Sequence, residues 1–312
     1  MYKFIALAAI IIGTTCKAQL RWQNVDSAFG PLPPSVHVYY SNDSIDGKPN
    51  IAYYVSADLK DKTLDFAAQI GHGKRFTPSQ YYLNEGKPLL VVNCTFFEFV
   101  HNSNLNLVMN NGQLLAYNNA AIVGRGKDTF TYRHAFASAI GISKKRKADV
   151  AWLYTDSSKP IPYASQVALP TVKDSSAKFV YRTNGLSKWK MQTAVGGGPV
   201  LLQDGNIQIS NNEELKFSGK TGLTDKHPRT CMGYTKDGKL IVMCIQGRFP
   251  KIAEGVNLTQ AAQLLKDLGC TEALNLDGGG SSCLLVNGKP TIQVSDKEGQ
   301  RPVPAVFMIK AK

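Results

Sequence analysis

Hairpin dipeptides separate the apolar runs of this chain and constrain its fold more than any other feature. Four of them are Asn111-Gly112, Asp204-Gly205, Asp237-Gly238 and Asn287-Gly288. Asn, Asp and Gly tolerate the positive φ angles that a two-residue β-turn requires. The dipeptides therefore predict β-hairpins along much of the chain.

Apolar runs of strand length surround these turns. They are residues 51–55, 89–93, 138–142, 151–154, 240–245, 271–276, 283–286 and 305–309. Two segments with apolar residues at helical spacing, 56–70 and 258–268, are predicted as helices. Asn257 is a suitable N-cap for the second helix, and Gly269 would end it. These elements predict an α+β fold, with a strand-rich mixed sheet core and a few packed helices in a single catalytic domain.

The first eighteen residues have the layout of a secretory signal peptide. A basic start precedes an apolar run at 4–12 that is too short to span a membrane. Cleavage after Ala18 would leave residues 19–50 as an extended, proline-containing lead-in and residues 51–312 as the catalytic domain. We therefore expect a secreted or periplasmic protein. A lipoprotein anchored through Cys16 is less favoured, because Gly13 stands where a large aliphatic residue is expected.

Charge and cysteine content argue against several classes of protein. The formal charge falls from +13 to +11 because Lys3 and Lys17 leave with the signal peptide, and a basic chain favours an anionic partner. The densest basic run, 144–147, has no interleaved aromatic residues, so nucleic acid is not a predicted partner. No later segment has the length of a transmembrane helix. Five cysteines remain after cleavage, and no Cys-x-x-Cys pair offers a thiolate zinc site.

A glycine-rich loop with one carboxylate follows the strand predicted at 271–276. It reads Asp277-Gly278-Gly279-Gly280-Ser281. Glycines let a sugar or a phosphate approach the main chain, and a carboxylate at a strand end suits catalysis or metal binding. The P-loop spacing is absent, which disfavours a nucleotide-binding loop. A flexible turn is the plain structural alternative.

Other candidate site residues stand in three further segments. Asn93 and Glu98 follow a predicted strand, and Gly197 and Gly198 precede a proline in a loop whose amides could hold an anion. A cap and a tight turn are the structural alternatives for these two segments.

The third segment brackets a predicted hairpin. His227 and Arg229 lie before the strand that leads to Asp237-Gly238, and Arg248 follows the return strand. The outer ends of an antiparallel pair lie together, so these side chains should meet. A histidine can carry a proton, and an arginine can grip a phosphate through two hydrogen bonds.

The order of these motifs resembles the phosphodiester glycosidase family. It runs from Asn-x-x-Phe-Phe at 93–97 through Gly-Gly-Gly-Pro at 196–199, His-Pro-Arg-Thr at 227–230 and Gly-Arg at 247–248 to Leu-Asp-Gly-Gly-Gly-Ser-Ser at 276–282. Arg301 corresponds to the arginine of the family's closing Arg-x-Val segment. Cys94 and Thr95 stand where the family often has glycines. The resemblance covers roughly residues 85–310.

The resemblance implies hydrolysis of a sugar-1-phosphodiester, in an envelope or environmental glycan. A phosphate leaving group needs little protonation, so the site needs anion stabilisation and one carboxylate. Asp277 is the preferred carboxylate, with Glu98 and Glu254 as alternatives, and His227 would donate a proton or orient the phosphate. The residues expected to bind an anionic glycan or sugar phosphate are Asn93, Gly197, Gly198, Arg229, Arg248, Gly278, Gly279, Gly280, Ser281 and Arg301.

Two other functions stay open on the residues alone. One is a carbohydrate-binding envelope protein without catalysis. The other is a metal-dependent phosphodiesterase, in which Asp277, Glu98 and His227 would bind a divalent metal. No residue pattern in the sequence demands a particular cofactor, and a divalent metal is the one candidate.

Overall fold

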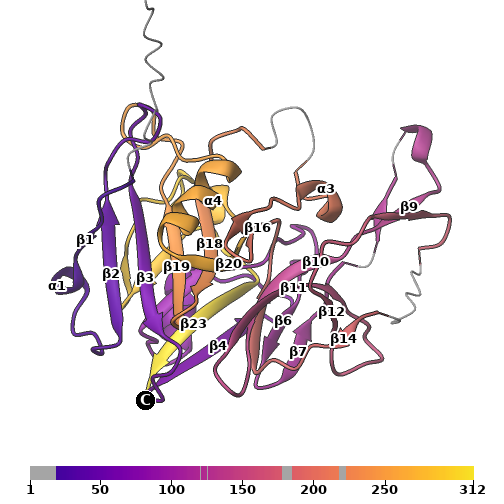
Figure 1. Cartoon of the computed structure of the whole chain (residues 1–312), viewed down its shortest axis with the longest axis horizontal. Helices are drawn as coiled ribbons and strands as arrows, with labels where there is room; N and C mark the ends of the chain where they lie inside the picture. Colours follow the sequence, from indigo (N-terminus) through magenta and orange to yellow (C-terminus); the bar gives the residue numbers. More distant parts are fainter. Residues whose placement is uncertain (1–18, 120, 125, 178–184, 218–222) are drawn as a thin grey trace, which may run out of the picture.

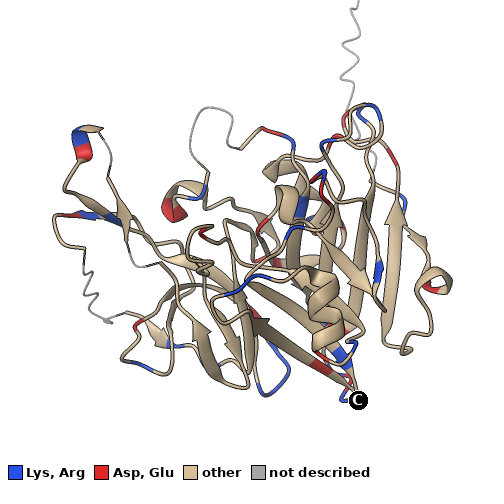
Figure 2. Cartoon of the chain, turned by 180° about the vertical axis from the view of Figure 1, so that it is seen from behind, with Lys and Arg blue, Asp and Glu red and all other residues tan. Residues whose placement is uncertain are grey.

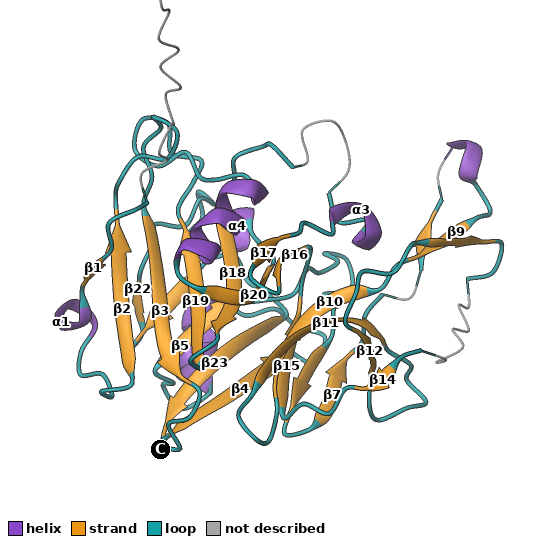
Figure 3. Cartoon of the chain, in the orientation of Figure 1, coloured by secondary structure: helices purple, strands orange, loops and turns teal. Residues whose placement is uncertain are grey.

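The computed structural model describes residues 19–119, 121–124, 126–177, 185–217 and 223–312, so the predicted signal peptide lies outside the described residues. The fold is strand-rich, with four sheets and a few short helices (Figures 1 and 3). The predicted α+β class is confirmed.

The largest sheet has the strand order β1-β2-β3-β19-β18-β20-β16-β17. Its strands are β1 (Gln23–Asn24), β2 (Val36–Ser41), β3 (Ala52–Asp58), β16 (Val200–Gln203), β17 (Asn206–Ile207), β18 (Arg229–Thr235), β19 (Lys239–Ile245) and β20 (Cys270–Asn275). β2 pairs with β3 along its whole length. The boundary predicted at residue 51 therefore runs through this sheet.

A five-stranded sheet, ordered β22-β21-β5-β23-β4, packs beside it. Its strands are β4 (Leu64–Ile70), β5 (Leu90–Asn93), β21 (Leu284–Val286), β22 (Lys289–Pro290) and β23 (Ala305–Ala311). One buried cluster joins both sheets to the next, through Val92 on β5, Val242 on β19 and Trp152 on β11.

A seven-stranded sheet, ordered β14-β12-β11-β10-β15-β6-β7, forms the other half of the molecule. Its strands are β6 (Val108–Asn110), β7 (Gln113–Ala116), β10 (Ala137–Ile142), β11 (Ala148–Tyr154), β12 (Tyr163–Ser165), β14 (Ser187–Lys188) and β15 (Thr193–Gly196). The three-stranded sheet of β8 (Ile122–Val123), β9 (Tyr132–His134) and β13 (Val172–Asp174) projects from this half as an arm (Figure 1).

Six short helices complete the described chain. They are α1 (Asp26–Phe29), α2 (Pro78–Asn84), η1 (Gly126–Asp128), α3 (Asn211–Glu214), α4 (Leu258–Asp267) and η2 (Gly279–Ser281). The predicted helix at 258–268 is confirmed as α4. Asn257 caps it by accepting from the Gln260 amide, and Gly269 follows it at φ +79°. Its apolar face is buried and includes Leu258, Ala261 and Leu265.

The predicted helix at 56–70 is wrong. Residues Ala52–Asp58 and Leu64–Ile70 are β3 and β4, in two different sheets. Phe66 and Ala67, adjacent on β4, belong to two different buried clusters, so both faces of this strand are covered. Two covered faces remove the alternation of apolar and polar residues that marks a strand in a sequence.

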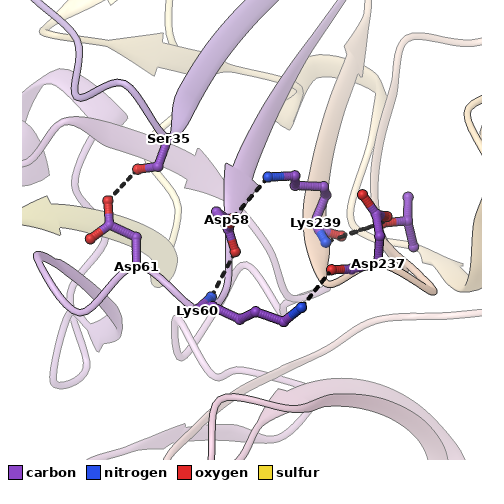
Figure 4. A network of polar contacts seen from close by, with 7 residues as sticks. Ser35, Asp58, Lys60, Asp61, Asp237 and Lys239 are labelled. Atoms are coloured by element: carbon purple, nitrogen blue, oxygen red, sulfur yellow. Dashed lines mark hydrogen bonds and ion pairs between the residues drawn. The ribbon is translucent and has the colours of Figure 1, made fainter.

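All four predicted hairpins are present, joining β6–β7, β16–β17, β18–β19 and β21–β22. Figure 4 shows the tip of β18–β19, where Lys239 pairs with Asp58 at 2.9 Å. The Lys60 ammonium donates to the Asp237 carbonyl at 3.2 Å. Such half-exposed ion pairs stabilise a fold by about 1 kcal/mol at most. This tip lies at the opposite end of the two strands from His227, Arg229 and Arg248.

Surface charge and cysteines agree with a globular fold. In the view of Figure 2, Lys and Arg are scattered over strands and loops. The five cysteines after the predicted cleavage site are buried and unpaired. Within the described ranges, no helix has both the length and the hydropathy of a membrane span.

Candidate active site

A pocket of about 410 Å³ opens where the chain leaves β20 and enters β18. Its lining residues are Phe96, Lys216, Phe217, Asp225, His227, Arg229, Arg248, Asp277, Gly278 and Gly279. The structure thus brings the Asp277 loop together with the outer ends of the β18–β19 pair, as the sequence predicts.

Main-chain hydrogen bonds fix the Asp277 loop on both sides. The Asp277 amide donates to the Cys94 carbonyl at 2.8 Å, and the Gly279 amide donates to the Pro228 carbonyl at 2.9 Å. Gly278 is also close to Pro228, because a Cβ added to it would lie 2.9 Å from that carbonyl oxygen. The carboxylate is therefore held between the exit of β5 and the entry of β18.

The Asp277 side chain is largely withdrawn from water. Its Oδ2 atom is buried and has no hydrogen-bond partner among the described residues. Burial raises the pKa of Asp277 to about 7, and the Ser281 hydroxyl, the Arg301 charge and the Gly278 amide oppose this rise. A carboxylate with a pKa near neutrality is suited to proton transfer at physiological pH.

Arg229 is a nearly buried cation on the pocket wall. Its side chain donates to the main-chain carbonyls of Val256 and Asp225, both at 3.1 Å, and lies 5.4 Å from the Phe217 ring centroid. Burial lowers its pKa. It forms no ion pair within the described part of the chain. A desolvated cation without a counter-ion is costly, so this position favours an anionic ligand.

Arg248 adds a second cation at the mouth of the pocket. It is exposed and has φ +66°, in the left-handed region that residues other than glycine adopt less often. A Cβ on Gly279 would lie 2.9 Å from its Nη2 atom. Gly279 therefore makes room for the Arg248 guanidinium above the loop.

His227 faces the same two arginines. Burial lowers the pKa of His227, and the charges of Arg229 and Arg248 lower it further. The imidazole is therefore neutral at neutral pH, and it can donate one hydrogen bond to a bound anion.

Comparison with known proteins agrees with the motifs and the geometry. Residues 86–310 match the phosphodiester glycosidase family. The chain belongs to this family. The N-acetylglucosamine-1-phosphodiester alpha-N-acetylglucosaminidase of Mus musculus is 31% identical over 103 residues, which cover 31% of this chain and 20% of the mouse protein. The SPbeta prophage-derived uncharacterized protein YomE of Bacillus subtilis is 38% identical over 90 residues, 29% of this chain and 14% of that protein. The chain thus spans about a fifth of the mouse relative and less of YomE.

Two solved structures share the fold. One is the catalytic domain of zebrafish N-acetylglucosamine-1-phosphodiester alpha-N-acetylglucosaminidase, with a TM-score of 0.63 and 19% identity over 95% of this chain and 89% of that chain. The other is a hypothetical protein from Synechocystis, with a TM-score of 0.60 and 15% identity over 94% of this chain and 68% of that chain.

The role predicted for Asn93, binding of an anionic glycan or sugar phosphate, needs correction. Asn93 is fully buried. Its amide nitrogen donates to the Asp277 carbonyl at 2.6 Å, and its oxygen accepts from the Thr230 hydroxyl and the Cys283 amide. All its polar atoms are used within the protein. Asn93 is therefore a positioning residue that holds the Asp277 segment against β18 and β21.

Asn93→Ala is expected to lower the free energy of unfolding by about 1–3 kcal/mol, because three buried groups lose their partner. It should also lower kcat more than it raises KM, since the Asp277 main chain loses an anchor. Urea denaturation and steady-state kinetics measure the two effects. Asn118→Ala, which removes another buried amide that bonds to Leu107, Ala137 and Leu153, is the matched control. It should be destabilised without the loss of kcat, and an equal loss of kcat would contradict the positioning role.

Ser281, Gly280 and Arg301 lie behind the carboxylate and do not line the pocket. Arg301 is paired with Asp296 through two hydrogen bonds of 2.7 and 3.0 Å. A Cβ on Gly280 would collide with both partners of this pair at 2.1 Å. The substrate-binding role predicted for these three residues is therefore replaced by support of Asp277.

The two alternative carboxylates are engaged elsewhere. Glu98 accepts hydrogen bonds from the Val100 and His101 amides and caps its own turn. Glu254 lies within 4.0 Å of the ammonium groups of Lys48 and Lys226. Neither lines the pocket, so Asp277 is the only one of the three predicted candidates that does.

The Gly197–Gly198 loop is structural. The Gly197 amide donates to the Ser138 carbonyl, and the Gly198 amide donates to the Asn275 carbonyl at 2.7 Å. Both residues are buried, and a Cβ on Gly197 would lie 2.6 Å from the same Asn275 oxygen. The prediction that these amides hold an anion is corrected, because close packing against β20 explains the glycines.

Three pocket residues, Lys216, Phe217 and Asp225, stand outside every motif found in the sequence. A fourth, Phe96, belongs to the Asn-x-x-Phe-Phe motif but was not predicted as a site residue. The rings of Phe96 and Phe217 meet edge to face at 6.0 Å, and the Lys216 ammonium lies 5.2 Å from the Phe96 centroid. The pocket therefore joins an aromatic wall to a third cation.

The ligand set proposed for a metal, Asp277, Glu98 and His227, is not assembled, since Glu98 lies outside the pocket. In the portion of the chain that is described, no three His, Cys, Asp or Glu side chains form a group that could hold a metal ion.

Proposed function

We propose that this protein hydrolyses a sugar-1-phosphodiester by breaking the bond between the anomeric carbon and the phosphodiester oxygen. The observation that carries the proposal is one pocket lined by Asp277, Arg229 and Arg248, with neither arginine in an ion pair with a described carboxylate. A bound phosphodiester supplies the missing negative charge, and arginine matches phosphate oxygens through parallel hydrogen bonds. Membership of the phosphodiester glycosidase family supports the same reaction.

In this mechanism Asp277 is the general base that activates water. A raised pKa makes its carboxylate a stronger base than an ordinary aspartate. The phosphate leaves as an anion stabilised by the arginines and by one hydrogen bond from neutral His227. Phe96 and Phe217 provide the apolar wall on which a sugar ring can rest. Direct attack by water would invert the configuration at the anomeric carbon.

The relatives' names make an N-acetylglucosamine-1-phosphodiester the first substrate to test. Because the predicted signal peptide implies export, we propose that the natural substrate is an envelope or environmental glycan outside the cytoplasm.

Hydrolysis in ¹⁸O-labelled water tests the reaction directly. We expect the label in the released sugar, with inverted anomeric configuration by NMR, and none in the phosphate. Label in the phosphate would replace the proposal with a phosphodiesterase. Binding without turnover across a panel of sugar-1-phosphodiesters would leave a carbohydrate-binding protein.

A further inference from the structure

A second pocket of about 340 Å³ lies beside the active site. Phe96 and Lys216 line both pockets, so these two side chains form the shared wall. Five aliphatic side chains cover most of the rest, namely Leu105, Ile122, Ala135, Ala137 and Leu215. The reaction proposed above does not use this space.

Two polar side chains of this second pocket, Glu214 and Asn106, are already engaged within the protein. The Glu214 carboxylate accepts from the Ser138 hydroxyl at 2.8 Å and from the Trp152 indole at 3.2 Å. Asn106 accepts from the Phe96 amide and donates to the Gly197 carbonyl. The surface left to a ligand is therefore mostly apolar, and its remaining polar groups are the Asn119 side-chain amide and the Lys216 ammonium at the shared wall.

We propose that this second pocket binds the alcohol portion of the phosphodiester, and that this alcohol is an alkyl or aryl group. The inference rests on the proposed function. A phosphate held by Arg229 and Arg248 has one further ester substituent besides the sugar. Lys216, which forms no ion pair with a described carboxylate, places an ammonium group on the wall that the two pockets share. A substituent that passes Lys216 reaches the aliphatic lining.

Ile122 lines the second pocket and is partly exposed to solvent. It is 41% exposed on β8, in the arm that projects from the seven-stranded sheet (Figure 1). Its neighbour Val123 is 64% exposed and does not line the pocket, as expected for successive residues of a strand that face opposite sides. The two residues form a matched pair for mutation.

The test compares two substrates with the same sugar-1-phosphate, one esterified with methanol and one with octanol. For the wild-type protein we expect kcat/KM to be at least about tenfold higher for the octyl ester, because apolar contacts in a pocket discriminate by this factor or more. Ile122→Asp should remove most of this preference and leave the methyl ester within twofold. Val123→Asp should change neither value. If Ile122→Asp does not fold, Ala135→Trp fills the same pocket and should give the same loss.

Equal kcat/KM for the two esters in the wild-type protein, or an equal loss on both in Ile122→Asp, overturns the proposal. If neither ester is hydrolysed, the proposed reaction fails, and titration calorimetry with octyl phosphate and methyl phosphate decides the pocket separately. At least about tenfold tighter binding of octyl phosphate, lost in Ile122→Asp, supports the apolar subsite. Equal affinities rule it out.

Discussion

Asp277→Asn is expected to lower kcat/KM for a sugar-1-phosphodiester by on the order of 10³-fold or more, the loss typical of removing one member of a catalytic unit. The amide has the size of the carboxylate but cannot accept a proton from water. KM should change little, because Arg229 and Arg248 hold the phosphate. Steady-state kinetics with the purified protein measures the loss, and unchanged turnover in a folded variant would remove Asp277 from catalysis.

The pH profile of the wild-type enzyme tests the role of base. A base acts only when ionised, so kcat/KM is expected to rise with pH and to level off above an apparent pKa of about 7. The pKa of His227 is lowered by burial and by the two arginines, so this side chain is neutral over most of the rise. A profile that instead falls above pH 7 would make Asp277 a general acid.

Stability should follow the same titration. The folded-state pKa of Asp277 is about 7 against an ordinary value of 3.8, so the folded protein binds the extra proton. The wild-type protein should therefore lose stability as pH rises from about 4 to about 7. Asp277→Asn lacks this loss and should gain about 1–2 kcal/mol relative to wild type between pH 4 and pH 8, less than the full shift because one face meets solvent.

Asp237→Asn is the matched control for the turnover measurement and for the pH profile. Asp237 sits at the far tip of the β18–β19 hairpin, and asparagine before Gly238 keeps the turn chemistry. Its turnover and its pH profile should equal those of the wild-type protein. A loss of turnover in this variant would show that the Asp277 result reflects folding.

Most of the fold could be predicted from local chemistry. The Asn-Gly and Asp-Gly turns place positive φ angles where the hairpins need them, and Asn257 begins α4 with a capping box. The segment 56–70 was the exception. Its polar turn between β3 and β4, where the Thr63 amide donates to Asp61, interrupts a run whose apolar spacing imitates a helix.

The site was predictable where a residue's neighbours are set by strand pairing. Arg229 pairs with Ile245 across β18 and β19, so Arg248 must lie near it. Lys216 and Phe217 follow no strand. Asn211 holds Phe217 in place by donating to its carbonyl at 2.9 Å and accepting from its amide at 3.0 Å. Such contacts of a loop with itself and with distant strands leave no periodic trace in the sequence.

Polar residues at strand ends were the least informative class. Asn93 ends β5 and Glu98 follows it, yet Asn93 is buried beneath the site and Glu98 caps an exposed turn. Residue type alone does not reveal whether a side chain faces the substrate or the protein. The burial and the hydrogen-bond partners of the side chain in the structure are needed to distinguish a binding residue from a positioning residue.

Arg229→Met is expected to lower kcat/KM by about 10²- to 10³-fold, the range seen when one preorganised charge-stabilising group is removed. Methionine keeps the length and the contact with Phe217 while it removes the charge. The free energy of unfolding should change little, because loss of a buried unpaired cation offsets the two hydrogen bonds to main-chain carbonyls. Inorganic phosphate should raise the unfolding temperature of the wild-type protein and should not raise that of the variant.

Arg146→Met separates these effects, because Arg146 makes the same kinds of contact as Arg229 but is only half-buried and lies outside the pocket. Arg146 donates to the main-chain carbonyls of Leu59 and Leu64 and lies 5.3 Å from the Phe66 ring centroid. Its loss should change stability through the same two kinds of bond while kcat/KM stays within about twofold and phosphate still stabilises the protein. If phosphate stabilised Arg229→Met as much as it stabilises Arg146→Met, the anion would bind elsewhere. The pocket would then not be the phosphodiester-binding site.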